Sequence, residues 1–294
     1  MDIIAYDKVQ LDKSVVALGK FQGLHNGHMM LINEVVAIAR KEQLTGVVFT
    51  INIHNDKMVN LPDERFAILE EMGVDVDVEC EFSSEFAMMQ PEQFVKSILV
   101  DKLNASYVVV GSDFRFGYKR QGDVSLLKTY GDKYGFEVIA FDKLCVDGNI
   151  VSSSLIRELI EAGNVDSVEK YMGRPYSVSG EVCTGKQLGR TIGFPTINII
   201  PKEDKLLPPY GVYETFINLD GTIYKGVTNV GNNPTVENTD RTFVETNIID
   251  FDDNLYGETV TVCFKRYIRK EKKFNSIEEL KNQIKRDKIC VMHQ

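Results

Sequence analysis

The strongest constraint on the fold is a change in the apolar pattern along the chain. In the first half, short uninterrupted apolar runs alternate with stretches of helical spacing. The runs are 15–18, 47–49, 108–111 and 138–140. Strands that are apolar at every position are buried on both faces, and intervening helices allow them to run parallel. The first half therefore predicts an α/β domain whose parallel sheet is covered on both sides.

The helices expected between these runs carry apolar residues three and four positions apart. The first includes Leu31, Ile32, Val35, Val36 and Ala39. The second covers 64–72 and ends at Gly73, and the third covers 91–103, with Pro91 in its first turn. A further helix before Gly163 closes this half.

After about Tyr171 the pattern changes to short alternating strands. The expected strands are 176–183, 211–219, 223–229, 243–249 and 259–267. Asp220-Gly221 separates two of them and indicates a hairpin. Ser276 and Glu279 form a capping box that begins a terminal helix. We predict a small antiparallel β-barrel with a terminal helix, and two domains, 1–170 and 171–294.

Charge and cysteine usage narrow the class of protein. The 34 basic and 43 acidic residues leave a net charge of −9, which disfavours a nucleic-acid partner. The five cysteines are odd in number and include no CxxC, which indicates reduced thiols. There is no apolar run of the roughly 18 residues needed to cross a membrane, and no signal peptide. We expect a cytoplasmic protein without a membrane partner, a monomer or weak homo-oligomer.

A glycine-rich loop with two histidines follows the first predicted strand. It reads Gly-Lys-Phe-Gln-Gly-Leu-His-Asn-Gly-His over 19–28. Loops after parallel strands lie at the ligand-binding edge of the sheet, and the next helix N-terminus favours an anion. We predict His25 and His28 as catalytic imidazoles that stabilise charge at phosphorus. The alternative is a glycine-rich turn with two surface histidines. The predicted ATP-binding residues here are Gly19, Phe21, Gly23 and Gly27.

A serine-rich helix start lies near the end of the first half. It reads Val-Ser-Ser-Ser-Leu-Ile-Arg over 151–157. Ser152 or Ser153 is a good N-cap, and Arg157, one turn later, presents a guanidinium fork suited to phosphate. An ordinary capped helix with an exposed arginine is the alternative interpretation.

The second half opens with a segment that also suits phosphate. Backbone amides of a turn-rich stretch and two basic side chains can hold phosphate oxygens. The residues concerned are Gly185, Lys186, Gly189 and Arg190. Thr196 and Asn198, two apart on one side of an extended segment, offer the neutral oxygens that Mg²⁺ accepts. A glycine-rich barrel crossover is the alternative.

These motifs together resemble one family. The HNGH loop with VSSSLIR resembles the nucleotidylyltransferase superfamily, and GSDFRFG with a following GD resembles its prokaryotic FAD synthetase branch. Residues 173–198 are similar, without gaps, to the riboflavin kinase signature. The resemblance covers essentially the whole chain and is to bifunctional riboflavin kinase/FMN adenylyltransferases.

The resemblance implies two reactions and their residues. The barrel would phosphorylate riboflavin with ATP and Mg²⁺, and the Rossmann-like first domain would adenylylate FMN with ATP to give FAD and pyrophosphate. Glu245 would activate the flavin hydroxyl, and Thr196 and Asn198 would hold Mg²⁺. The other implied ATP-site residues are Ser153, Ser154, Arg157 and Pro195. The implied flavin-site residues are Asp113, Phe114 and Arg115 in the first domain and Arg269 and Glu271 in the second.

The first domain departs from the family pattern at the nucleotide edge. Gln22 replaces the aspartate of FDGxHxGH, and Asn52 and Ile53 replace the acid and first proline of TF(D/E)PHP. An amide keeps hydrogen bonding without charge, and loss of proline loosens a loop. We therefore expect slow adenylyl transfer. The alternatives are a riboflavin kinase with weak or lost adenylyl transfer and a flavin-nucleotide-binding regulatory paralogue.

Overall fold

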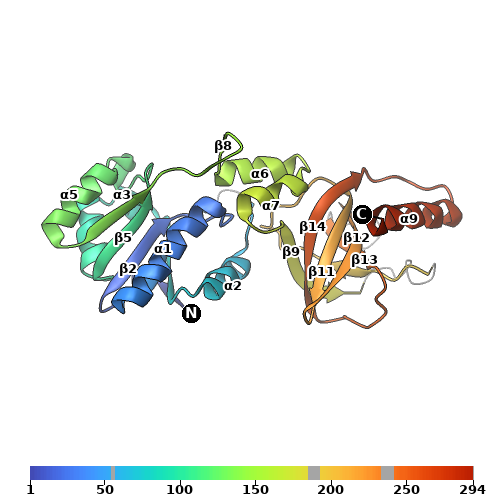
Figure 1. The fold of residues 1–294 in the computed structure, drawn as a ribbon, viewed down its shortest axis with the longest axis horizontal. Helices are drawn as coiled ribbons and strands as arrows, with labels where there is room; N and C mark the ends of the chain where they lie inside the picture. Colours follow the sequence, from blue (N-terminus) through green and yellow to red (C-terminus); the bar gives the residue numbers. More distant parts are fainter. Residues whose placement is uncertain (54–56, 185–192, 233–241, 294) are drawn as a thin grey trace. The chain divides into compact units, whose positions relative to one another are not determined.

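The computed structural model describes residues 1–53, 57–184, 193–232 and 242–293. Its contacts divide the chain into two compact units, Met1–Ser153 and Ser154–Gln294. Each unit has its own sheet (Figure 1). In the described parts of the chain, no helix is long and apolar enough to span a membrane.

The first unit is built on a parallel sheet to which the described residues contribute six strands, in the order β1-β4-β3-β2-β5-β6. All five strand pairs are parallel, so the carboxyl ends of the strands lie along one edge. This confirms the predicted α/β class. The strands are β1 (Asp2–Ala5), β2 (Ser14–Gly19), β3 (Thr45–Asn52), β4 (Val76–Glu81), β5 (Ala105–Gly111) and β6 (Glu137–Phe141).

Both faces of this sheet are covered. In β2, Val15 and Ala17 enter one core while Val16 and Leu18 enter the other, which is why the run is apolar at every position. Helices α1 (Asn26–Glu42) and α2 (Pro62–Met72) supply the first core. Helices α4 (Pro91–Phe94) and α5 (Val124–Tyr134), with the turn between 95 and 100, supply the second.

The helix expected over 91–103 changes character after its first turn. Val95–Val100 is π-helical, with Asp101 N–H bonded to the Lys96 carbonyl and Leu103 N–H to that of Ile98. This wider turn keeps both Ile98 and Leu99 at 1% exposure or less. The remaining small elements are α3 (Ser84–Met88), a 3-10 turn at Tyr118–Arg120 and a hairpin of β7 (Cys145–Val146) and β8 (Asn149–Ile150).

The second unit is a closed antiparallel barrel, in the order β10-β13-β12-β11-β14-β9 over the described residues. Asp220 and Gly221 both have positive φ, 49° and 84°, as the predicted tight hairpin requires. The barrel with its terminal helix confirms the fold predicted for this half. The strands are β9 (Ser177–Cys183), β10 (Ile197–Ile199), β11 (Gly211–Leu219), β12 (Thr222–Asn232), β13 (Thr242–Ile248) and β14 (Thr259–Arg269).

Three helices accompany the barrel among the described residues: α6 (Ser153–Glu161), α7 (Val165–Met172) and α9 (Ile277–Met292). Helix α7 packs on β14 and buries Val168 and Tyr171. The Ser276 hydroxyl accepts from Glu279 N–H and begins α9, as the capping box predicts. Arg266 and Lys225 donate to the carbonyls of Cys290 and Val291, which attaches the end of α9 to β14 and β12.

Besides the two-residue strands β7 and β8, three strands were not predicted. β1 is a mostly exposed edge strand, and β10 has only three residues. β4 reads Val-Asp-Val-Glu-Cys-Glu, an alternation typical of a half-solvated strand, yet Asp77 is 1% exposed. An ion pair with Arg65 explains its burial.

Candidate functional site

The loop after β2 is held by buried apolar side chains in left-handed backbone. Phe21 and Leu24 have φ of 46° and 36° and are fully buried, and Gly23 between them has φ 79°. Non-glycine residues rarely adopt such values outside sites where the surroundings impose them. The loop therefore presents its polar end, rather than its apolar residues, at the carboxyl edge of the sheet.

His25 and His28 stack at the start of α1. Their rings lie parallel, 3.7 Å apart at 13°, and His25 Nδ1 accepts from His28 N–H as the N-cap of α1. A Cβ on Gly27 would lie 3.2 Å from the His25 ring, so glycine leaves room for the stack. Two imidazoles thus lie at a helix N-terminus, an arrangement that can receive an anion.

Three segments meet at Gln22. Its carbonyl accepts from Ser153 Oγ at 2.7 Å, and its Nε2 donates to the Ile53 carbonyl at 3.4 Å. The Ser153 hydroxyl therefore ties the histidine loop to the start of α6. Two of the departures from the family pattern, Gln22 and Ile53, contact each other directly.

A buried ionic network, not predicted from the sequence, lies beside this loop. Arg65 Nη2 contacts Glu79 at 2.6 Å and Asp77 at 3.4 Å, and Thr50 Oγ1 donates to Asp77 at 2.7 Å. Burial raises the pKa of Asp77, although the Arg65 charge opposes the shift. Arg65 Nη1 also reaches Asn52 Oδ1 at 3.5 Å. The alternating acidic residues over 77–81 were the sequence feature from which this network could have been predicted.

Asn52 is held from two sides. Its Oδ1 accepts from Arg65, and its Nδ2 donates to Glu81 Oε1 at 3.1 Å. An amide can do both, whereas a carboxylate could not donate to Glu81. Asn52, the third departure from the family pattern, is therefore compatible with an acidic residue at Glu81 of β4.

The flavin residues predicted for the first domain lie on the loop after β5. Asp113 pairs with Lys143 at 2.9 Å, and Arg115 pairs with Asp123 at 3.1 Å, all four with exposed side chains. Phe114 stacks on Phe116 with ring centroids 5.8 Å apart. A hydrogen bond from Leu126 N–H, in the first turn of α5, lowers the pKa of Asp123.

Ser154 and Arg157 belong to α6, and the boundary between the two units falls directly before Ser154. Ser153 is the member of this motif that contacts the histidine loop within the first unit. Gly185, Lys186, Gly189 and Arg190 lie outside the described residues.

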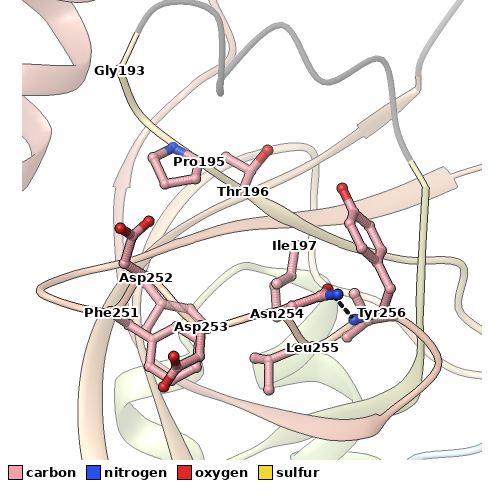
Figure 2. A pocket seen from close by; sticks show the side chains of 12 residues that line it. Gly193, Pro195, Thr196, Ile197, Phe251, Asp252, Asp253, Asn254, Leu255 and Tyr256 are labelled. Carbon is pink, nitrogen blue, oxygen red and sulfur yellow. Dashed lines mark hydrogen bonds between the residues drawn. The ribbon is translucent and has the colours of Figure 1, made fainter.

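In the second unit, a cavity of about 460 Å³ opens beside the start of β10. Figure 2 shows Pro195 and Thr196 on one side of it and the 251–256 segment opposite. Asn254 Oδ1 accepts from Tyr256 N–H at 3.1 Å and shapes that segment. The sequence did not single out Phe251–Tyr256 as site residues, because Asp-Asp-Asn there reads as an ordinary turn.

A second cavity, of about 330 Å³, lies between the barrel and α9. It is lined by five residues of the predicted site: Thr196, Asn198, Glu245, Arg269 and Glu271. Leu280 and Ile284 of α9 form its apolar wall. Such a cavity, with an apolar wall facing a polar one, suits an aromatic ligand with a polar tail.

Thr196 lines both cavities. Its hydroxyl donates to Glu245 Oε1 at 2.8 Å. β10 and β13 pair with Asn198 opposite Glu245, so the register of the two strands brings these residues together. A group transferred from one cavity to the other would pass this point.

Asp287 fixes Arg269 at the far end of the second cavity. The Asp287 carboxylate, 3% exposed, accepts from Arg269 Nε and Nη2 at 3.1 and 2.7 Å, and also from Gln283 at 2.9 Å. Glu271 accepts from Asn229 at 3.0 Å and lies against Gly231, where a Cβ would collide with it. The predicted flavin residues of this half therefore line one cavity.

Comparisons with known proteins agree with this division. The riboflavin kinase family profile matches residues 172–293, and the FAD synthetase profile matches 7–155. A crystal structure of a protein described as a macrolide-efflux protein from Streptococcus pneumoniae superposes with a TM-score of 0.89 and 31% identity, covering all of both chains.

Relatives are similar over nearly the whole chain. The bifunctional riboflavin kinase/FMN adenylyltransferase of Escherichia coli K12 is 34% identical over 286 residues, 94% of this chain and 90% of that protein. The enzyme of the same name from Bacillus subtilis 168 is 33% identical over 294 residues, 96% and 92% of the two chains. With both halves matched at this coverage, the chain belongs to the family of bifunctional riboflavin kinase/FMN adenylyltransferases.

Proposed function

We propose that the barrel phosphorylates riboflavin with ATP to give FMN, and that the first unit transfers AMP from ATP to FMN to give FAD and pyrophosphate. Family membership and the names of the full-length relatives support both steps. The observation that carries the kinase step is the pair of cavities that share Thr196, with Glu245 hydrogen-bonded to it.

In the kinase step, ATP would occupy the larger cavity and riboflavin the smaller. Glu245 accepts the proton of the terminal ribityl hydroxyl as its oxygen attacks the γ-phosphorus and ADP leaves. The Thr196 hydroxyl holds the Glu245 carboxylate in place. Arg269 and Glu271 would contact the flavin from the far end of the cavity.

Mg²⁺ would be held by nucleotide phosphates together with the oxygens of Thr196 and Asn198. Both side chains offer uncharged oxygens as metal ligands. Thr196 lines both cavities and Asn198, 7% exposed, lines the smaller one. Among the described residues there is no group of three or more acidic, histidine or cysteine side chains placed to hold a metal ion. In nucleotide-dependent enzymes Mg²⁺ is commonly bound through the substrate phosphates. When bound, Mg²⁺ neutralises charge on the phosphates.

In the adenylyl step, the α-phosphate of ATP would lie at the N-terminus of α1 against His25 and His28. Both imidazoles donate to oxygens that gain charge as an FMN phosphate oxygen attacks and pyrophosphate leaves. Ser153, Ser154 and Arg157 would hold the triphosphate, with the loop residues Gly19, Phe21, Gly23 and Gly27. Asp113, Phe114 and Arg115 would contact FMN.

All five cysteines lie in the described ranges and are free. Free thiols suit a reducing compartment, which supports the proposal that the protein acts in the cytoplasm. The net charge of −9 supports small-molecule substrates rather than a nucleic-acid partner. We propose a monomer or a weak homo-oligomer.

The test is a time course with riboflavin, ATP and Mg²⁺, with the flavins separated by chromatography. FMN should appear first and FAD should follow. Absence of FMN would contradict the kinase assignment. FMN without any FAD would reduce the protein to a riboflavin kinase, and tight flavin-nucleotide binding without turnover would indicate a regulatory paralogue.

A further inference from the structure

Asn247 occupies an unusual position on the barrel. It follows Glu245 by two residues in β13, so both face the same side of the strand. Thr246 between them is fully buried in the barrel interior, where its hydroxyl bonds that of Thr228 at 2.8 Å. Asn247 therefore faces outward onto the smaller cavity, yet it is only 5% exposed. Asparagine is seldom buried to this degree without a specific partner.

The hydrogen-bond partner of Asn247 lies just beyond the point where the backbone pairing of β10 with β13 stops. β10 pairs with β13 up to Ile197 opposite Thr246. Pro195 has no N–H and cannot extend such a ladder. In its place, Asn247 Nδ2 donates to the Pro195 carbonyl at 2.6 Å. A side-chain hydrogen bond thus continues the attachment of the segment to β13.

Two adjacent residues of the segment are consequently held by two residues of one strand face. Asn247 holds Pro195, and Glu245 accepts from Thr196. Since Thr196 lines both cavities, the amide of Asn247 sets the position of the segment across which the phosphoryl group would pass.

The oxygen of the Asn247 amide, unlike its nitrogen, lacks a hydrogen-bond partner among the residues that the structure describes. This oxygen, Oδ1, is buried. A buried acceptor left unpaired is unfavourable, so a ligand donor that reaches it is favoured. The proposed substrate has donors on its polyol hydroxyls and on its ring imide, and the polyol is the part that must reach Glu245, two residues from Asn247 on the same strand face.

We propose that Asn247 positions the Pro195–Thr196 segment through Nδ2 and accepts a hydrogen bond from a polyol hydroxyl of the flavin through Oδ1. The inference rests on the proposed kinase function and adds a residue to it. It predicts that one side chain affects both turnover and flavin affinity.

The experiment compares Asn247→Ala, Asn247→Asp and wild type in full-length protein. Asn247→Ala should lower kcat for FMN formation and raise KM for riboflavin, each roughly tenfold, as loss of one buried hydrogen bond predicts. Asn218→Asp, at an exposed position of β11, is the matched control and should behave as wild type.

Asn247→Asp separates the two roles. A carboxylate keeps an acceptor for the flavin but cannot donate to the Pro195 carbonyl, whereas a neutral carboxyl can. Its kcat relative to wild type should therefore rise as the pH falls from 8 to 6. The other charged groups lining the cavity are common to both proteins, so the ratio isolates position 247. They are Glu245, Arg269, Glu271, Lys272 and Asp287.

The outcomes are distinct. Wild type that makes no FMN overturns the proposed function, and this inference with it. Wild type that makes FMN, with folded Asn247→Ala matching it in kcat and riboflavin KM, overturns the inference alone. Should Asn247→Ala unfold in a thermal melt, the isosteric Asn247→Asp decides: a kcat ratio that does not change with pH contradicts the positioning role.

Discussion

At the scale of single residues, the two sites depend on side chains that hold one another. His25 serves at once as the N-cap of α1 and as the stacking partner of His28. Glu245 is held by Thr196, and Arg269 by Asp287. Each proposed site residue thus has a partner that orients it before substrate arrives, which is what transition-state stabilisation requires.

His28→Ala should slow conversion of FMN to FAD by roughly 10²–10³-fold, the effect of losing one transition-state donor. Riboflavin phosphorylation should be nearly unchanged, because it uses the barrel. The measurement is a time course of both flavins, with His293→Ala, an exposed residue after α9, as the control. Equal FAD rates in wild type and His28→Ala would refute the role of the loop.

Glu245→Gln should abolish FMN formation, because an amide cannot accept the ribityl proton. Riboflavin binding, followed by quenching of flavin fluorescence, should remain measurable since the cavity keeps its shape. Glu181→Gln, on an exposed position of β9, is the matched control. Undiminished FMN production by Glu245→Gln would remove this residue from the mechanism.

At the scale of elements, the main feature is the ionic network between α2 and the neighbouring strands β3 and β4. Three acids, Asp77, Glu79 and Glu81, alternate along β4, and Arg65 of α2 neutralises two of them. A buried ion pair contributes little net stability, but removing one partner leaves the other charge uncompensated. The network therefore fixes α2 against the sheet next to the histidine loop.

Arg65→Met should lower the free energy of unfolding by about 3–5 kcal/mol. Burial already raises the pKa of Asp77 above its unfolded value, so its contribution to stability is lost as the pH rises through the folded pKa. Loss of Arg65 raises that pKa further. The destabilisation should thus be larger at pH 8 than at pH 5.5, measured by urea unfolding.

The control for this variant is Lys133→Met, which removes a surface pair with Glu92. Its free energy of unfolding should stay close to that of wild type at both pH values, because exposed pairs contribute little. An equal loss for Arg65→Met at both pH values would show that Asp77 is not the group left uncompensated.

Asn52→Asp restores the family's acid but places a carboxylate against Glu81. Like charges directly opposite on paired strands destabilise by about 0.5–1 kcal/mol, so the Tm should fall. Asn52→Asp combined with Glu81→Gln should recover the Tm and form FAD faster than wild type. An unchanged Tm for Asn52→Asp alone would contradict this account, as would a double variant no faster than wild type.

At the scale of the whole molecule, the chain consists of two compact units with their own cores. The predicted boundary at 170 lies within α7, which packs on β14. The family profiles leave residues 156–171 unmatched, so where the boundary falls stays a prediction. The packing of α7 indicates that these residues support the barrel.

A fragment of residues 154–294 should be soluble and phosphorylate riboflavin at the rate of the full chain. A fragment of residues 173–294 lacks α7 and exposes the β14 surface that α7 covers. Each apolar side chain lost from burial costs about 1.5–3 kcal/mol, so its Tm should be markedly lower. Thermal melts and FMN assays of the two fragments decide between them. Equal stability would place the boundary at 172.

The sequence by itself determined the two fold classes, because periodicity reports which faces of a strand are buried. The uninterrupted run of β2 required two covered faces, and alternation such as that of β14 after Tyr171 required one. It also singled out the histidine loop and the Thr196–Asn198 segment, since each lies in a contiguous motif, whereas Glu245 followed only from the family resemblance. Local patterns carry such information directly.

Only the tertiary structure decided the contacts between distant segments. The burial of Asp77 depends on Arg65, twelve residues earlier, and that of Asn247 on Pro195, 52 residues away. Asp287 meets Arg269 only because α9 returns to the barrel. A polar residue read in its own segment predicts solvent exposure, because the partner that satisfies its hydrogen bonds is supplied by packing rather than by its neighbours in the chain.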